Sequence, residues 1–448
     1  MKNDLLAVVA LAHAAGAGTA LARAVAPVAQ DDVRAVVAEM LADADQRTSL
    51  LANGAAGSGH DGKNFVLTDA SGAFKLAIAG QVQFRYQMNF RDPQDGGPNT
   101  TPGRSSDDFE SGFETRRTRL IATGTIVDPK MFYFIQSDFS RSSGDFGLLD
   151  AYAGYKYDGG FSLRWGQFKS PFMREELLSD KYQLVIDRSN MNTVFSQDRV
   201  QGVEGSYRND NINLALEFSD GFISKNSEFG TVNGLGNLGF ARGGRESDWA
   251  LTGRLDWKVA GDWKQFDTFT SEPGSAFACL LGVAGHVEGS ANDIAANVGG
   301  TPTQGDTIYS AWTIDLSLEG DGWNAFAAGV GTYQDTGLQG LDDRNTADYG
   351  VLVQGGFYLP DTDWELFARY DAIFQDTDRG PTGSDDSFGT VTFGTNYYWA
   401  GQAAKFTVDV QWFLDSSTQL MTSNSSNGFL RTTEDNEVNL RFQFQILF

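Results

Sequence analysis

The strongest constraint on the fold of this sequence is the alternation of its last eleven residues. From Val438 to Phe448 every second residue is apolar, and the positions between them are Asn, Arg, Gln and one leucine. Period-two alternation is typical of a β-strand with one apolar and one wet face. Both a half-buried strand of a soluble protein and a strand of a membrane barrel have this pattern. The rest of the chain must therefore distinguish the two.

The same alternation recurs along the chain from residue 74 onward, which predicts about sixteen strands. That number lies within the even-numbered range of bacterial membrane barrels. No internal stretch of about twenty apolar residues could cross a bilayer as a helix. The expected strands are 74–87, 113–127, 131–139, 148–157, 161–168, 200–208, 211–219, 248–258, 277–287, 307–319, 323–333, 347–359, 363–375, 388–399, 404–415 and 438–448.

The connections between these strands alternate between two kinds. Short turns lie at 128–129, 158–160, 209–211, 320–322, 361–363 and 400–402. Long polar loops lie at 91–112, 140–147, 169–199, 220–247, 288–306, 334–346, 376–387 and 416–437. One turn, 259–276, occupies the place of a short turn but is longer than the others. A closed membrane barrel needs this asymmetry, whereas a β-sandwich or propeller does not produce it. The predicted fold is an all-β transmembrane antiparallel barrel with a short N-terminal amphipathic helix.

The N-terminus predicts export and two further segments. Residues 1–24 read as a signal peptide, because a basic residue precedes an apolar run and a small-residue tract with an A-x-A-like site at 22–24. Residues 25–62 are expected to form a periplasmic helix, 31–51, followed by a linker. The barrel is then expected to occupy 63–448.

Composition argues against catalysis and cofactor binding. The chain has one cysteine and three histidines, His13, His60 and His286, and no H-E-x-x-H, G-x-S-x-G or Cys/His cluster. The formal net charge of −24 gives no reason to expect a nucleic-acid partner. We therefore expect no enzyme activity, cofactor or metal. A barrel hydrolase that uses His286 is kept as an alternative.

The segment 169–199 differs from the other predicted loops in composition. It combines both signs of charge with apolar residues such as Phe172, Leu184 and Met191, which a loop moving freely in water does not need. We expect it to fold into the barrel and narrow it, with its cations facing its acids across the opening so that solutes are sorted by charge. The alternative is a surface loop with local ion pairs. The charged residues expected at the constriction are Arg174, Glu175, Glu176, Lys181, Asp187, Arg188, Asp198 and Arg199.

Strand parity predicts which arginines face the interior. If Phe84 faces lipid, then Arg85 faces water, and the same alternation turns Arg117, Arg119 and Arg164 inward. Charged and amide side chains are too dense at the inward positions for a dry core, which predicts a water-filled lumen.

Four motifs in the chain resemble those of one porin family. They are 80–85 (GQVQFR), 113–120 (FETRRTRL), 149–155 (LDAYAGY) and 164–172 (RWGQFKSPF). Together with a closing strand that carries Phe444, Ile446 and Phe448, they make the chain similar to the phosphate-selective porin O/P family. The resemblance implies a sixteen-stranded trimeric porin in the outer membrane of a Gram-negative-type bacterium, with an inward-folded third loop. The partners it implies are lipid, two further copies of the chain, the barrel-assembly machinery that reads the closing strand, and small polar solutes or anions.

The expected function is a passive channel for small hydrophilic solutes or ions, with or without a preference for anions or phosphate. The lysine cluster of the family's phosphate-specific members is not visible in the sequence, and acidic loops would repel anions at long range. Three rivals remain: a structural outer-membrane barrel or adhesin without an open pore, the hydrolase named above, and a soluble β-protein.

Overall fold

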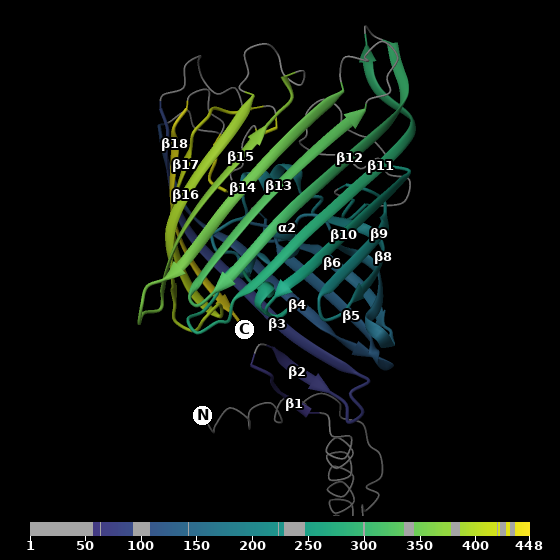
Figure 1. Ribbon diagram of the computed structural model, residues 1–448, viewed down its shortest axis with the longest axis vertical. Helices are drawn as coiled ribbons and strands as arrows, with labels where there is room; N and C mark the ends of the chain where they lie inside the picture. Colours follow the sequence, from purple (N-terminus) through teal and green to yellow (C-terminus); the bar gives the residue numbers. More distant parts are fainter. Residues whose placement is uncertain are drawn as a thin grey trace, which may run out of the picture. The chain divides into compact units, whose positions relative to one another are not determined.

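In the computed structural model, the chain forms one closed antiparallel barrel (Figure 1). The structure describes residues 57–62, 64–92, 108–141, 143–222, 224–227, 247–298, 301–335, 345–377, 386–418, 420–421, 427–430 and 435–448. Within these ranges, each strand from β3 to β18 pairs with its neighbour in the sequence, and β18 returns to pair with β3. The predicted count of sixteen barrel strands is therefore confirmed. No helix among the described residues is long and apolar enough to span a membrane.

The strands of the barrel match the predicted runs one for one. They are β3 (Lys75–Phe90), β4 (Phe109–Ile126), β5 (Asp128–Phe139), β6 (Phe146–Lys156), β7 (Phe161–Lys169), β8 (Arg199–Arg208), β9 (Ile212–Ser219), β10 (Trp249–Ala260), β11 (Ala278–Val298), β12 (Thr301–Gly320), β13 (Trp323–Asp335), β14 (Thr346–Tyr358), β15 (Trp364–Phe374), β16 (Ser387–Tyr398), β17 (Ala404–Phe413) and β18 (Glu437–Leu447). We call the end of the barrel where β3 begins the turn end, and the end where β3 finishes the loop end.

The barrel closes where the alternating C-terminal strand meets the first barrel strand. Phe444 of β18 lies opposite Phe84 of β3, and the backbone of Phe448 exchanges two hydrogen bonds with Gly80. The ring of Phe448 lies over Gly80, where an added Cβ would be 2.2 Å from it. Along β18 the apolar positions are partly or fully exposed and the polar positions are buried, as the alternation predicts. This strand therefore turns its apolar face outward, which is the inverse of a soluble protein.

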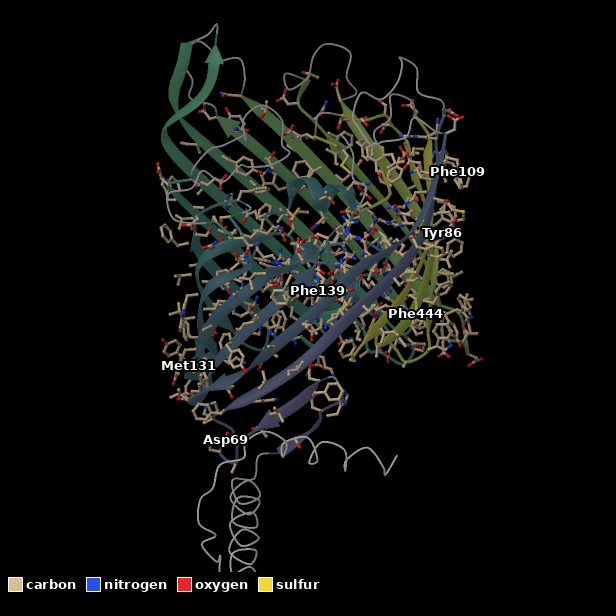
Figure 2. All side chains as sticks on the ribbon, turned by 180° about the vertical axis from the view of Figure 1, so that it is seen from behind. Asp69, Tyr86, Phe109, Met131, Phe139 and Phe444 are labelled. Carbon is tan, nitrogen blue, oxygen red and sulfur yellow. The ribbon has the colours of Figure 1, made fainter. Side chains whose placement is uncertain are left out.

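The outer wall is an apolar belt. Trp257, Trp312, Ile314 and Val353 are among many large apolar side chains that are at least half exposed there. Figure 2 shows carbon-rich side chains such as Tyr86 and Phe444 on the outside, whereas nitrogen and oxygen atoms crowd the interior. Such a surface suits lipid rather than water.

One predicted loop is wrong. The polar segment 288–306 is not a loop, because β11 and β12 continue through it and pair from Ala278 with Glu319 up to Val298 with Thr301. Hydrophobic alternation marks a strand only where one face meets an apolar medium. A ribbon beyond the membrane can pair its backbone without that pattern, so composition alone does not separate it from a loop.

Most of the predicted N-terminal region lies outside the described residues. The signal peptide 1–24 and the helix 31–51 lie outside the described residues. Near the end of the expected linker, β1 (Gly57–His60) pairs with β2 (Phe65–Thr68), which in turn pairs with the first residues of β3. A Gly-rich segment can form this hairpin, because turn-forming residues lie between β1 and β2.

Part of the interior is an apolar cluster, although the sequence predicts a water-filled lumen. The inward side chains of β13 to β16 include Phe326, Val330, Leu352 and Phe367, which are all buried in one hydrophobic cluster with residues of the segment 169–199. Burial of this apolar surface fixes the segment to the wall.

Candidate functional site

The segment between β7 and β8 fills the interior from the loop end towards the turn end. It contains α2 (Arg174–Leu177), the 3-10 turn η2 (Asp180–Tyr182) and α3 (Asn190–Phe195). We call residues 170–198 the inner loop. At the turn end, the carbonyl oxygen of Tyr182 accepts a hydrogen bond from the backbone of Phe269, and that of Lys181 accepts one from Gln445. The inner loop thus runs through most of the depth of the barrel.

A capping serine and a close contact with the wall explain the position of α3. Ser189 caps α3, because its side chain accepts a hydrogen bond from the backbone of Asn192 at 2.9 Å, and it donates one to Glu175 at 2.6 Å. The far side of α3 packs on the wall at Gly350, where an added Cβ would lie 2.6 Å from Met191 and 2.8 Å from Phe195. The absence of a side chain at Gly350 lets the helix approach the strand closely.

Asp187 is the main ionic anchor of the inner loop. Its carboxylate lies 2.7 Å from Arg85, 2.9 Å from Arg117 and 3.1 Å from Arg441. Burial would raise the pKa of the Asp187 carboxyl, but the surrounding guanidinium groups hold the pKa well below its usual value of 3.8. The side chain therefore stays charged, and it joins β3, β4 and β18 to the loop.

Asp180 is a second anchor, which sequence reasoning did not single out. Its carboxylate contacts the guanidinium groups of Arg117 and Arg119 on β4. Burial opposes ionisation, yet Arg119 and Arg117 hold the pKa of Asp180 well below its usual range. Nothing in the sequence distinguishes Asp180 from the neighbouring acids, because its role depends on its approach to β4.

Two further contacts of the inner loop reach the opposite wall. Arg174 donates to the hydroxyl of Ser317 and to the carbonyl of Phe266, both at 2.8 Å. Glu175 lies 3.7 Å from Arg369 of β15, and burial raises the pKa of the Glu175 carboxyl. These contacts span the barrel from one side to the other.

The remaining predicted residues pair within the loop or at its ends. Arg188 donates to backbone carbonyls of the loop and lies 3.3 Å from Glu176. Asp198 pairs with Arg199, which also lies 3.1 Å from Asp150 of β6. Arg164 of β7 pairs with Glu204 of β8 at 2.5 Å.

The arrangement differs from the expected one in two ways. The loop acids Asp180 and Asp187 meet cations of the wall, so the cations and acids of the loop do not face one another across an opening. Arg85 points inward as its parity predicts, but it is fully buried in the ionic contact and does not face water. Buried charges need such partners, because an isolated charge would be costly in a dry interior.

Arg116 was missed because a β-bulge interrupts the alternation. The register between β3 and β4 shifts between Gln83 and Phe84, opposite residues 115 to 117. As a result Arg116 and its neighbour Arg117 both reach the interior, and Arg116 lies 3.6 Å from Asp187. Strict period-two parity would place only one of two adjacent residues inside.

Two adjoining cavities lie between the inner loop and the wall formed by β3 to β11. The smaller, of about 350 Å³, is lined by residues that include Ala79, Phe134, Gln136 and Asp150. The larger, of about 690 Å³, reaches Lys156 at the turn end of β6. Both share Tyr152, Arg164 and Leu177. Together they follow β6 from Asp150 to its last residue.

Cations outnumber acids in the lining of the smaller cavity. Only Asp150 is acidic among its lining residues, whereas the cationic residues are Arg119, Arg164, Lys169, Lys181 and Arg199. Lys169 was not predicted as a site residue, and it donates to the carbonyls of Glu176 and Leu178. The fold thus brings Lys169 and Lys181 to one cavity, although they are separated in the sequence and form no visible cluster there.

Two further connections pack against the inner loop. The turn after β10 contains the 3-10 turn η3 (Gln265–Asp267), and Phe266 and Phe269 are buried beneath Arg174. At the loop end, Asn427 donates to Asn190 at 3.1 Å. The long turn 259–276 therefore contributes to the interior, which explains its unusual length.

The alternative catalytic residue His286 lies in a buried polar group. Its ring nitrogen Nδ1 is 2.9 Å from the hydroxyl of Thr252, and Nε2 is 3.5 Å from Glu288. All three side chains are buried, and none lines either cavity described above. In the part of the chain that the structure describes, no group of three or more His, Cys, Asp or Glu residues is arranged to hold a metal ion.

Comparisons with known proteins agree with this architecture. Residues 81–232 match the model of the family described as phosphate-selective porin O and P. No curated protein matches the chain. The anion-selective porin from Comamonas acidovorans is 11% identical with a TM-score of 0.56, and the match covers 83% of this chain and 99% of that one.

Two other solved structures have a similar fold. The outer membrane channel DcaP of Acinetobacter baumannii is 16% identical with a TM-score of 0.50, covering 85% of this chain and 99% of that one. The trimer form of OmpT from Vibrio cholerae is 15% identical with a TM-score of 0.50, covering 83% and 99%. The predicted resemblance to the porin O/P family is thus confirmed over residues 81–232, and the barrel has the fold of bacterial outer-membrane porins.

Proposed function

We propose that this chain is a passive outer-membrane porin with a modest preference for small anions, and that it makes or breaks no covalent bond. The family match and the porin fold support the channel and its location in the outer membrane. The observation that carries the proposal is the pair of adjoining cavities beside an inner loop that is pinned by buried ion pairs. In this proposal the fixed loop keeps the two cavities open as part of a path along one wall.

The anion preference follows from the charge of the smaller cavity. Arg119, Arg164 and Arg199 each have a carboxylate partner that holds the guanidinium group in place. Lys169 donates to two backbone carbonyls, and its carboxylate neighbour Glu176 lies farther away at 3.7 Å. A cavity with this excess of cations attracts anions at short range, and acidic groups elsewhere are screened beyond about 10 Å at 0.1 M salt. The similar porin of Comamonas acidovorans is itself described as anion-selective.

The test is a planar-bilayer recording of the purified protein under a KCl gradient. We expect discrete conductance steps with a reversal potential directed towards chloride, and partial block by added phosphate. The variant Lys169→Gln should shift the reversal potential towards zero, whereas Lys130→Gln, at an exposed turn-end position paired with Asp158, should not.

Other outcomes would contradict the proposal. A cation-directed potential would reject the anion preference while keeping the porin. Absence of steps from folded protein would favour the structural barrel without a pore.

The same proposal includes trimer assembly, recognition of the closing strand by the barrel-assembly machinery, and a constriction formed by the inner loop. Steps that occur in groups of three would support the trimer.

A further inference from the structure

Four aromatic side chains form a continuous ladder on the inner wall beside the cavities. We call Phe132, Phe134, Tyr152 and Phe168, from β5, β6 and β7, the aromatic ladder. Tyr152 stacks on Phe134 with ring centroids 5.3 Å apart, and its edges meet Phe132 at 6.4 Å and Phe168 at 6.2 Å. Phe132 lies over Gly154, where a Cβ would be 2.4 Å from the ring, so the glycine keeps the ring flat against the wall.

Cations accompany this ladder. The guanidinium group of Arg164 lies 4.2 Å from the ring centroid of Phe168 and 5.3 Å from that of Tyr152. The ammonium group of Lys156 lies 5.5 Å from that of Phe132. Contacts of this length are favourable cation–π interactions, and they hold the positive charges next to the apolar rings.

The exposure of the ladder needs an explanation. Phe132 and Phe134 are only partly buried, and each lines one of the two cavities, while Tyr152 lines both. Apolar surface that faces water is unfavourable, so a path that serves inorganic ions alone gains nothing from it. A solute with a flat apolar body would cover these rings, and an anionic group on that solute would reach Arg164.

We propose that the aromatic ladder and Arg164 form a binding site for small aromatic monocarboxylates on their way through the barrel. This inference rests on the proposed porin function and names a substrate class for it. The ring of the solute stacks on Phe134 and Tyr152, and its carboxylate accepts hydrogen bonds from cations of the smaller cavity. Neutral sugars also stack on aromatic rings, but the excess of cations in the lining favours a charged ligand.

The experiment measures block of the KCl current in planar bilayers by benzoate, acetate and glucose. Benzoate should half-block the current at a concentration about three- to tenfold below that of acetate, because only benzoate gains ring stacking. The ratio should fall to about one in Phe134→Leu, which keeps an apolar side chain of similar bulk but removes the aromatic face. Phe134→Ala provides a second reading if the leucine variant folds poorly.

Phe113→Ala is the matched control, because Phe113 is an aromatic side chain of the outer face and is 71% exposed. It should leave the ratio unchanged. Equal block by benzoate and acetate, or block by glucose as strong as that by benzoate, would overturn the proposal while leaving the porin intact. If the native protein gives no current, the proposed function fails, and calorimetric titration of benzoate into the folded protein in detergent decides the site separately. Heat of binding that is lost in Phe134→Leu supports the site, and its absence overturns it.

Discussion

At the scale of single residues, Asp187 is the side chain on which most of the interior depends. It is fully charged, buried, and shared by arginines of three strands, Arg85, Arg117 and Arg441. Removing one partner from a buried ionic group costs far more stability than the intact group contributes in net terms. The reason is that the remaining charges stay buried without a counter-charge. The Asp187 carboxylate therefore controls the position of the inner loop.

The variant Asp187→Asn keeps the size of the side chain and removes its charge. We expect it to destabilise the folded inner loop by about 3–5 kcal/mol, since buried guanidinium groups are left unpaired. Single-channel recordings should show a larger and noisier conductance, and proteases should cleave within 170–198 more readily. Asp145→Asn, at an exposed position, is the control. A conductance equal to that of the native protein would show that the loop is held by its apolar contacts alone.

The same carboxyl predicts a dependence on pH. Because the pKa of Asp187 is depressed on folding, its stabilising contribution is complete above its usual value of 3.8 and is lost as pH falls through the lower folded value. The stability difference between the native protein and Asp187→Asn should be constant from pH 7 to about pH 5 and shrink only in stronger acid. Thermal unfolding in detergent across this range measures it. A difference that already shrinks near neutral pH would exclude Asp187 as its source.

Residue-level prediction from the sequence worked where the backbone is regular. Parity placed Arg117 and Arg119 inside, and the structure agrees. It missed Arg116, because a bulge is a property of two paired strands and leaves no mark on one of them. It also missed Asp180 and Lys169, whose neighbours depend on how the inner loop folds back.

At the scale of elements, the alternation of apolar and polar residues predicts a strand only where one of its faces contacts an apolar medium. All sixteen barrel strands were predicted, and most ends agree within a few residues. The exception is the ribbon of β11 and β12, which continues beyond the predicted ends at 287 and 307. The contents of the interior were less predictable, because the inward faces of β13 to β16 mix polar and apolar residues, and only the folded inner loop shows which of them form the apolar cluster.

The packing of α3 on β14 gives an element-scale prediction. In Gly350→Ala the new Cβ overlaps Met191 and Phe195, so α3 must move away from the wall. We expect a loss of about 1–3 kcal/mol and faster hydrogen exchange in 190–195, with a change in conductance although no charge is altered. Gly329→Ala is the control, because the nearest atom to its Cβ lies at 3.9 Å. Unchanged exchange in Gly350→Ala would mean that the helix does not depend on this close approach.

At the scale of the whole molecule, the barrel wall and its contents are separable. Backbone pairing around the full circle, including β18 with β3, closes the barrel without help from the inner loop. The inner loop in turn depends on the wall for its charges and its apolar cover. The wall can thus close without the inner loop, whereas the inner loop cannot hold its position without the wall.

Replacing residues 171–197 by a short Gly/Ser linker tests this separation. We expect a barrel that still folds, because water can solvate Arg85 and Arg441 once the loop is gone. Its conductance should rise several-fold because the interior widens, while its melting temperature drops because Phe326 and Leu352 become exposed. Heat-dependent gel migration reports folding, and bilayer recording reports conductance. Failure to fold would contradict an independent wall.

The ionic contacts of Asp187 also impose an order in time. Arg85 belongs to the first barrel strand and Arg441 to the last, and 254 residues separate Asp187 from Arg441 along the chain. The loop cannot acquire its full set of counter-charges until these two strands meet. Before the barrel closes, the inner loop therefore lacks part of its ionic contacts. Pairing of the first and last strands is the step that fixes the loop and, with it, the width of the channel.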